Sequence, residues 1–377
     1  MGIDRFTTYT VHIQHGQGIA IGDGAQVIQH VASPALAAST PPAVTVTLLT
    51  RVVPTATCHH LDAAAFPLVT AGLDNTGQGC QDADVRITAV IEGYSDTATA
   101  SAAVPAGERT QVTLLPLLRP AAVASLNEIR PATLRIVVEQ TASVARGLYD
   151  RTERIHLHAR DTALLALQAP DGSIVDLADY LAAWVTPRRP EIERLLRAAA
   201  ERHPDRRFVG YQGAASLAQG AAVVREQARA IFAGLKEDAG LVYVNSPLSL
   251  GAEAGQIAQR VRLPSESLAA VGSANCLDGA VLFASLLELT AVDTLLVIVP
   301  GHAFAGWRVW QGIDRYEFVE TTLIGYADFD EAQASAQASH DDALMRGYFK
   351  RGLFDPAGFA RVVDVTACRE KGIHPLE

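Results

Sequence analysis

The sequence is poor in cysteine, in basic charge and in long apolar runs, and each shortage excludes a class of protein. Four cysteines in 377 residues are too few for a disulfide framework, which indicates a reducing compartment. A net charge of −10 leaves no basic field to bind phosphates, so we expect no nucleic acid partner. The chain has no run of about 18 apolar residues, and its N-terminus lacks a basic start followed by an apolar core. We therefore expect a cytoplasmic protein with no membrane partner.

Apolar residues are nevertheless plentiful enough for ordinary cores. They make up 49% of the chain, and 377 residues are enough for two domains. Residues 1–42 predict a β-hairpin, with Gly22-Asp23-Gly24 between two β-rich runs, and then a Pro- and Ala-rich linker. Residues 43–162 hold about seven short β-type runs separated by turn residues, which predicts an antiparallel β-sandwich of immunoglobulin-like type.

Two histidine-containing runs in the predicted sandwich raise the question of a metal site. Cys58-His59-His60 carries metal-binding side chains, but neighbours on a strand point to opposite faces and no second ligand pair lies nearby. His156 and His158 share one strand face, where a solvent-facing polar row is the simpler interpretation. We therefore expect no metal. The runs VTAGLDNTG, ADVRITAVIEGYSD and VPAGERTQVTLLP resemble bacterial immunoglobulin-like domains, which implies a fold but no function.

Beyond the predicted sandwich, the spacing at which apolar residues recur changes from two residues to about 3.6. This change predicts an α+β domain over residues 163–377. Helices are expected over 174–185 and 190–203, the second capped from Thr186, and a third ends at Gly240. A further helix is expected after Phe329, followed by a strand and a basic tail that holds a structural cysteine, Cys368. The core-facing stripe of the third helix is expected to be Val223, Ala230, Ile231 and Leu235.

The stretch from Val271 to Ile324 holds a cysteine, a histidine and two glutamates in an order that suits a cysteine nucleophile. Asn275 is a favourable helix N-cap, Cys276 would be the first helical residue, and Asp278 could complete a capping box. The positive end of a helix favours a thiolate, although the charge of Asp278 opposes it. The apolar run that follows predicts a buried helix.

His302 and the two glutamates lie on the strands expected next. A strand-like run leads to Gly301-His302, and a second run, YEFVETT, carries Glu317 and Glu320. Strand alternation puts these glutamates on opposite faces, and both have a simple interpretation as solvent-facing positions. A lone cysteine beside an apolar helix is usually an inert core residue. Cys276 departs from that pattern because it stands in a polar turn, with a histidine at a nearby strand end.

The motifs ARAIFAGLKEDAGLVYV, QRVRLPSESL, NCLDGAVLFASLLEL, LLVIVPGHAFAGW and YEFVETT together resemble the transglutaminase-like domain of papain-type cysteine enzymes, over roughly residues 222–326. The resemblance implies that Cys276 is the nucleophile, His302 the base and Glu320 the orienting carboxylate. Glu320 stands where the family more often has Asp, and Phe304 where it more often has Trp. One oxyanion donor is expected to be the Cys276 backbone amide. The second donor stays open among Asn275, Ser273 and Gln212.

This resemblance implies a cysteine-dependent acyl-transfer enzyme with a Cys-His-Glu triad and a thioester intermediate. Hydrolysis of a peptide or isopeptide bond is the first interpretation, while transglutaminase or glutamine deamidase activity and a catalytically silent binding or scaffold module stay open. No cofactor is implied, and calcium would need an acidic, oxygen-rich loop that the sequence lacks. The expected partner is a protein or peptide substrate. A regulatory partner acting through the N-terminal hairpin or the sandwich is a further open alternative.

Overall fold

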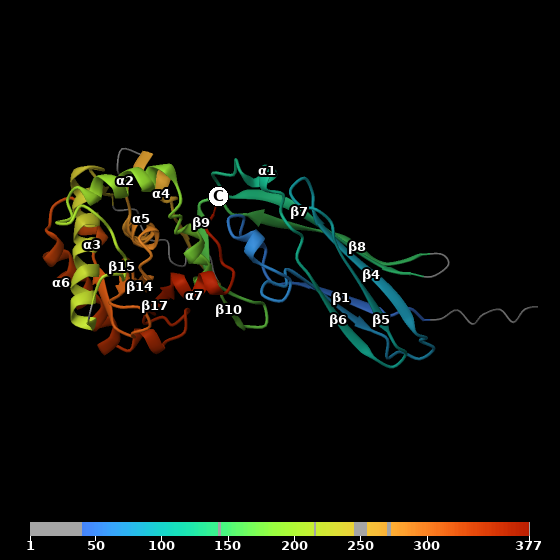
Figure 1. Ribbon diagram of the computed structural model, residues 1–377. Coiled ribbons are helices and arrows are strands. Elements are labelled where there is room, and N and C mark those ends of the chain that lie inside the picture. The colour runs from blue at the N-terminus through green and yellow to red at the C-terminus, as the bar shows by residue number, and fades with distance from the viewer. Residues whose placement is uncertain (1–39, 142–144, 215, 245–254, 270–272, 377) are drawn as a thin grey trace, which may run out of the picture.

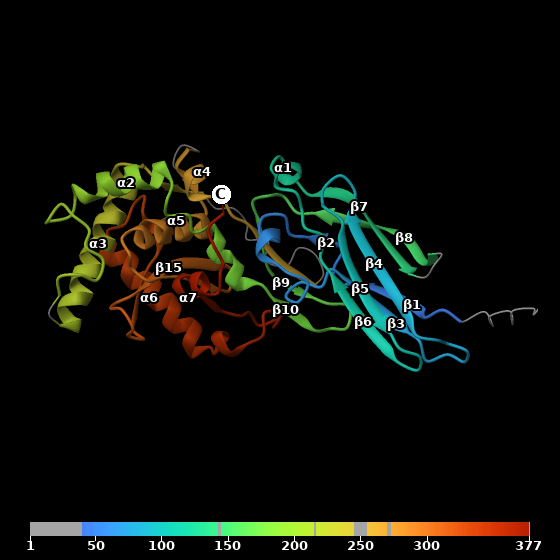
Figure 2. The same cartoon turned by 45° about the vertical axis from the view of Figure 1, so that its right-hand side comes forward.

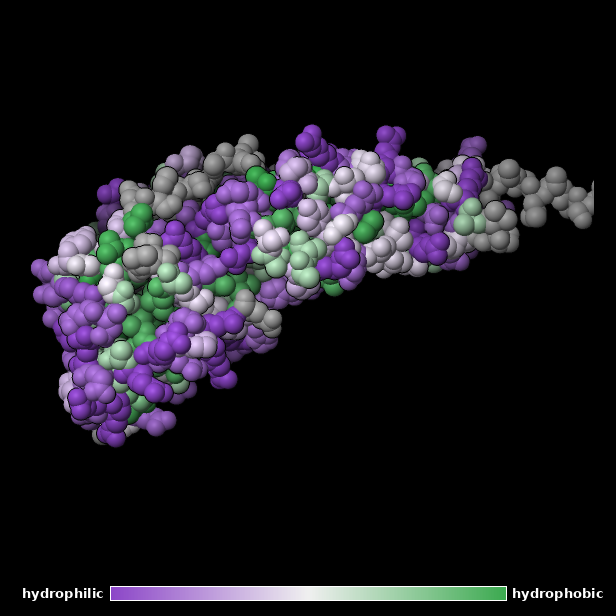
Figure 3. Space-filling view, turned by 90° about the horizontal axis from the view of Figure 1, so that it is seen from above, coloured by the Kyte–Doolittle hydropathy of each residue, from purple (hydrophilic) through white to green (hydrophobic). Residues whose placement is uncertain are grey.

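The computed structural model describes residues 40–376 except 142–144, 215, 245–254 and 270–272, and they form a multidomain, mixed α/β protein with several β-sheets. An all-β half and a half that holds most of the helices lie side by side (Figures 1 and 2). The hairpin and linker predicted for residues 1–42 lie almost wholly outside the described residues. Hydrophilic residues cover most of the face seen in Figure 3, with apolar residues between them in both halves. Of the described helices, none is both long and apolar enough to cross a membrane.

Two sheets form the all-β half. The first has the order β1-β3-β6 and the second the order β2-β8-β7-β4-β5. The strands are β1 (Ala43–Leu48), β2 (Val52–Val53), β3 (Val69–Asp74), β4 (Ala83–Ile91), β5 (Ala98–Val104), β6 (Arg109–Leu114), β7 (Arg130–Gln140) and β8 (Arg146–Leu157). Alternate residues of β4, such as Val85 and Ile87, are buried, as expected for strands with one face on a core. The buried faces of both sheets meet in one shared core.

The seven predicted β runs correspond to β1 and β3 to β8, but two local predictions in this half are wrong. Cys58–His60 forms a short 3₁₀ helix, η1, and not a strand. His158 is buried and is not part of a solvent-facing row. Its burial follows from the pairing of β2 with the end of β8, where the His158 N–H donates to the carbonyl of Val53. Strand β2 has only two residues, too few for a detectable apolar alternation.

A small sheet joins the two halves. Strand β9 (Thr162–Gln168) lies between β10 (Ile174–Asp176) and β12 (Gln256–Arg260). Leu164 and Leu167 of β9 pack in the sandwich core, whereas its residues Ala163, Leu165 and Ala166 pack in the core of the other half. The boundary predicted between residues 162 and 163 therefore falls inside a strand that belongs to both cores.

The second half is built around an antiparallel sheet with the order β16-β15-β14-β17. Helix α5 covers one face and α6 the other: Leu296 and Ile298 of β14 face the α5 core, and Leu295 and Val297 face the α6 core. The helices are α2 (Pro190–Ala200), α3 (Leu217–Glu237), α4 (Pro264–Ala269), α5 (Cys276–Leu289), α6 (Phe329–Met345) and α7 (Val365–Glu370). The strands are β11 (Val242–Tyr243), β13 (Ser273–Ala274), β14 (Thr294–Val299), β15 (His302–Arg308), β16 (Tyr316–Val319) and β17 (Arg361–Asp364).

Several helix predictions need correction. The segment predicted as a helix over 174–185 forms β10 and a 3₁₀ helix, η2 (Ala178–Trp184), because its first residues pair with β9. Helix α2 begins at Pro190 as predicted, but its N-cap is Arg189 and not Thr186, whose N–H instead donates to the hydroxyl of Ser285 on α5. In α3 the predicted core residue Val223 is only half-buried, and the next residue, Val224, is fully buried in its place. The expected C-terminal tail forms helix α7, which buries Cys368.

Candidate active site

Cys276 is the first residue of α5, and the local sequence explains why the helix begins there. The Asn275 side-chain oxygen accepts hydrogen bonds from the N–H groups of Leu277 and Asp278, at 2.9 and 2.8 Å. The Asp278 carboxylate accepts in return from the Asn275 N–H at 3.1 Å. The predicted capping box is therefore present, and it fixes the backbone on both sides of the cysteine.

Helix α5 is buried from Cys276 to Leu287, as the apolar run predicted. Cys276 itself is only 2% exposed. Gly279 lies one turn into the helix, where the segment after β16 packs closely against it. A Cβ at this position would lie only 2.8 Å from Oγ1 of Thr321. Gly279 was not among the predicted site residues, yet the absence of a side chain there lets Thr321, and with it the adjacent Glu320, lie close to the start of α5.

His302 begins β15, directly after the turn residue Gly301, whose φ of +73° lies in the left-handed region. Its Nε2 lies 2.5 Å from Oε2 of Glu320. The other oxygen of Glu320 accepts from the N–H and the hydroxyl of Thr322, at 3.0 and 2.7 Å. Both carboxylate oxygens of Glu320 are thus held, and Thr322 is a further residue whose role the sequence analysis missed. The carboxylate is nearly buried, at 4% exposure.

The imidazole of His302 links Glu320 to the thiol. Burial lowers the pKa of His302, but hydrogen bonds with Cys276 and Glu320 outweigh it and raise the pKa from 6.5 to about 10. Because Nε2 faces Glu320, Nδ1 is the ring nitrogen left for the sulfur. The structure therefore brings Cys276, His302 and Glu320 into one hydrogen-bonded chain, in which the imidazole readily holds a proton at neutral pH.

Glu317 lies within β16, whereas Glu320 follows the strand as the cap of a 3₁₀ turn, and Glu317 is buried, contrary to the predicted solvent-facing position. Its carboxylate forms an ion pair with Arg225 of α3, with Nε and Oε2 3.0 Å apart. Gln333 of α6 also donates to it at 3.3 Å. Glu317 therefore links α3 and α6 to the sheet. None of these bonds involves Cys276, His302 or Glu320.

The candidate oxyanion donors differ in position. As the first helical residue, Cys276 has a backbone N–H without an intrahelical acceptor. The side-chain oxygen of Asn275 is engaged as the helix cap. Its side-chain NH₂ group is the part that could donate to an oxyanion. Gln212 is a wrong prediction: Gly210, two residues before it, packs against Thr290, beyond the opposite end of α5. The side chain of Ser273 lies outside the described residues.

Tyr243 is an aromatic residue at the site that the sequence analysis missed. Strand β11 pairs with β13 so that Tyr243 lies opposite Ala274, two residues before the cysteine. Burial raises the pKa of Tyr243, and the charges of Cys276 and Glu320 raise it further. A polar cavity of about 320 Å³ lies beside the start of α5. Its lining residues are Asp161, Val244, Arg260, Arg262, Asn275 and Asp278.

Among the residues that the structure describes, the other cysteines and histidines form no comparable site. Burial raises the pKa of Cys58 to about 11 and that of Cys368 to about 12, so both thiols stay protonated at neutral pH. In the described part of the chain, no three His, Cys, Asp or Glu side chains converge as metal ligands would. No protein-family model matches the chain, and no curated protein matches it. The residues of the site are therefore the basis for a functional proposal.

Proposed function

We propose that the protein is a cysteine-dependent acyl-transfer enzyme, with hydrolysis of a peptide or isopeptide bond in a protein substrate as its reaction. The hydrogen-bonded chain of Cys276, His302 and Glu320 carries this proposal. The resemblance to transglutaminase-like, papain-type domains and to an immunoglobulin-like sandwich supports it. So does the free state of all four cysteines, which suits a reducing, cytoplasmic setting.

Before the first half-reaction His302 already holds the proton taken from Cys276, and the sulfur then attacks the substrate carbonyl carbon as a thiolate. The carbonyl oxygen becomes an oxyanion, which the backbone N–H of Cys276 can stabilise at the helix end. The imidazolium then gives its proton to the departing amine as the C–N bond breaks. A thioester on Cys276 remains, and Glu320 holds the ring in the required orientation throughout.

In the second half-reaction the imidazole of His302 takes a proton from water as the water oxygen attacks the thioester carbon. The C–S bond then breaks, which releases a carboxylic acid and restores the thiolate of Cys276 beside the protonated His302. An amine in place of water would give a transglutaminase, and a glutamine side chain as acyl donor with water as acceptor would give a deamidase. All three reactions use the same protein groups. The 2% exposure of Cys276 favours a second candidate, a silent or partner-gated module, because a buried thiol cannot meet a large substrate without movement.

The proposal is tested by incubating protein mixtures with the wild-type enzyme and with Cys276→Ala. Mass spectrometry then reads new chain termini, a mass increase of about 1 Da at glutamine, and cross-linked peptides. New termini that need Cys276 support the hydrolase, and changes at glutamine that need Cys276 identify the deamidase or transglutaminase. Identical products from both proteins would favour the silent module.

A further inference from the structure

The segment of residues 260–266, here called the junction segment, is held by the all-β half. The guanidinium of Arg260 forms an ion pair with Asp161 at 2.9 Å and donates to the carbonyl of Asn127 at 2.7 Å. The N–H of Val261 donates to the carbonyl of Asp161 at 2.7 Å. These bonds connect the junction segment to the end of the sandwich both by side chains and by backbone.

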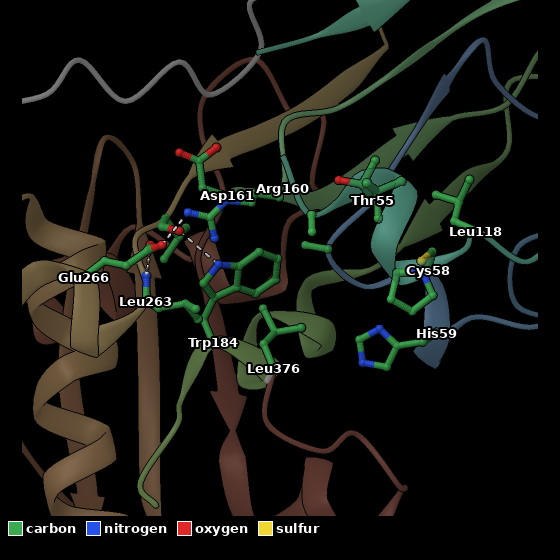
Figure 4. Close-up of a pocket in the computed structure, with 15 residues that line it drawn as sticks. Thr55, Cys58, His59, Leu118, Arg160, Asp161, Trp184, Leu263, Glu266 and Leu376 are labelled. Carbon is green, nitrogen blue, oxygen red and sulfur yellow. Dashed lines mark hydrogen bonds and ion pairs between the residues drawn. The ribbon is translucent and has the colours of Figure 1, made fainter. Parts of the chain in front are cut away.

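A second connection runs through Arg160 and Glu266. The guanidinium of Arg160 lies 2.6 Å from the carboxylate of Glu266 at the start of α4. The backbone N–H of Arg160 donates to Leu126 in the sandwich, so this arginine is fixed to the all-β half. In Figure 4, Arg160, Asp161 and Glu266 gather at one end of a cavity of about 230 Å³, which residues of both halves line.

The other side of the junction segment contacts the start of α5. The N–H of Arg262 donates to Oδ1 of Asp278 at 2.8 Å, while Oδ2 of the same carboxylate accepts from Asn275. Asp278 is 1% exposed, and burial raises its pKa against the opposing effect of these two N–H donors. The buried carboxylate of Asp278 therefore depends on two N–H donors, Arg262 in the junction segment and Asn275 at the cap of α5.

We propose that the all-β half positions Cys276 through the junction segment, with Arg160 and Glu266 as positioning residues. The inference rests on the proposed function, and it gives the sandwich a role in it. A shift of the junction segment would remove one donor from Asp278, leave a buried acceptor unsatisfied and loosen the capping box. Cys276 would then move relative to His302, and misplacement by about 1 Å can lower a rate by about 10²-fold.

The test uses Arg160→Glu, Glu266→Arg and the double variant that restores the ion pair in reverse. The rate of Cys276 alkylation by iodoacetamide is measured from pH 5 to 9, together with hydrogen exchange of the Leu277 and Asp278 amides. Each single variant is expected to lower the rate about 2- to 10-fold, shift its pH profile and speed amide exchange. The double variant is expected to recover most of each effect.

The matched control is the pair Arg86 and Glu139, which lies 2.8 Å apart within the sandwich and has similar exposure. Reversal of either charge there should leave all three readouts unchanged. Single variants at Arg160 and Glu266 that behave like this control, or a double variant that recovers nothing, would overturn the inference. If wild-type Cys276 proves unreactive, the proposed function fails, but exchange of the two cap amides still decides whether the halves are coupled.

Discussion

Glu320 is held at both carboxylate oxygens, by His302 and by Thr322, whereas Glu317 lies in an ion pair with Arg225. The two glutamates stand three residues apart and differ in what they do because Glu317 lies within β16, whereas Glu320 follows the strand as the N-cap of the next 3₁₀ turn. At the scale of single residues, one carboxylate therefore serves the site and the other serves the packing of helices on the sheet.

This difference predicts distinct effects of two matched substitutions. Glu320→Gln should lower turnover by about 10²- to 10⁴-fold, because the imidazole loses its orienting charge. Glu317→Gln should leave turnover nearly unchanged but lower the free energy of unfolding by about 1–3 kcal/mol, because a hydrogen bond to a charged group is weakened. Steady-state kinetics and urea unfolding of both variants provide the check. Equal turnover in the wild type and Glu320→Gln would leave a Cys276–His302 pair without a third member.

The raised pKa of His302 predicts a pH dependence with a definite sign. The folded pKa of about 10 exceeds the ordinary 6.5, so protonated His302 stabilises the fold fully below about pH 6.5. That contribution is lost as the pH rises toward 10. Ring chemical shifts should place the His302 titration well above neutral in the wild type and closer to 6.5 in Glu320→Gln. The Tm difference between the two proteins should shrink from pH 6.5 to 10, and a constant difference would contradict the coupling.

At the scale of elements, the start of α5 shows what the sequence can and cannot predict. Asn275, Cys276 and Asp278 form the capping box expected from local spacing, because capping bonds join residues three apart. The second N–H donor to the Asp278 carboxylate belongs to Arg262, which stands 16 residues earlier in the sequence. The ion pair of Glu317 likewise comes from Arg225, 92 residues away. Such partners follow from tertiary packing, which no local pattern contains.

Gly279 connects α5 to the segment that carries Glu320, and it gives a prediction at this scale. Gly279→Ala places a Cβ 2.8 Å from Oγ1 of Thr321, so Glu320 should be displaced from His302. Turnover should fall at least about 10-fold, even though alanine has the higher helix propensity. Gly325→Ala is the matched control, because its Cβ would meet only the carbonyl of Leu241 at 3.5 Å. Equal turnover in both variants would show that the approach of Thr321 to α5 is unimportant.

At the scale of the whole molecule, the two halves share a strand. Different residues of β9 enter different cores, with Leu164 in the sandwich and Leu165 in the α/β half. The sequence could not predict this arrangement, because a strand buried on both faces has no polar alternation to read. The change in the spacing of apolar residues predicted near residue 163 falls inside this shared strand.

Shared packing predicts that the halves unfold together. All three tryptophans, Trp184, Trp307 and Trp310, lie in the α/β half, and only Trp184 also lines the cavity between the halves, so their fluorescence reports mainly that half. Leu164→Ala removes a side chain from the sandwich core and should lower the free energy of unfolding by about 2–5 kcal/mol. The urea midpoint seen by tryptophan fluorescence should fall together with the midpoint seen by circular dichroism. An unchanged fluorescence midpoint would mean that the halves unfold independently.

If Cys276 is an activated nucleophile, its thiol should be alkylated faster than the other thiols of the native protein. Mass spectrometry follows the labelling of each thiol by iodoacetamide at pH 7. Cys276 should react at least about 10-fold faster than Cys58 and Cys368, because burial keeps both of those thiols protonated. His302→Ala should abolish this advantage. A Cys276 that reacts no faster than Cys58 and Cys368 would contradict the account.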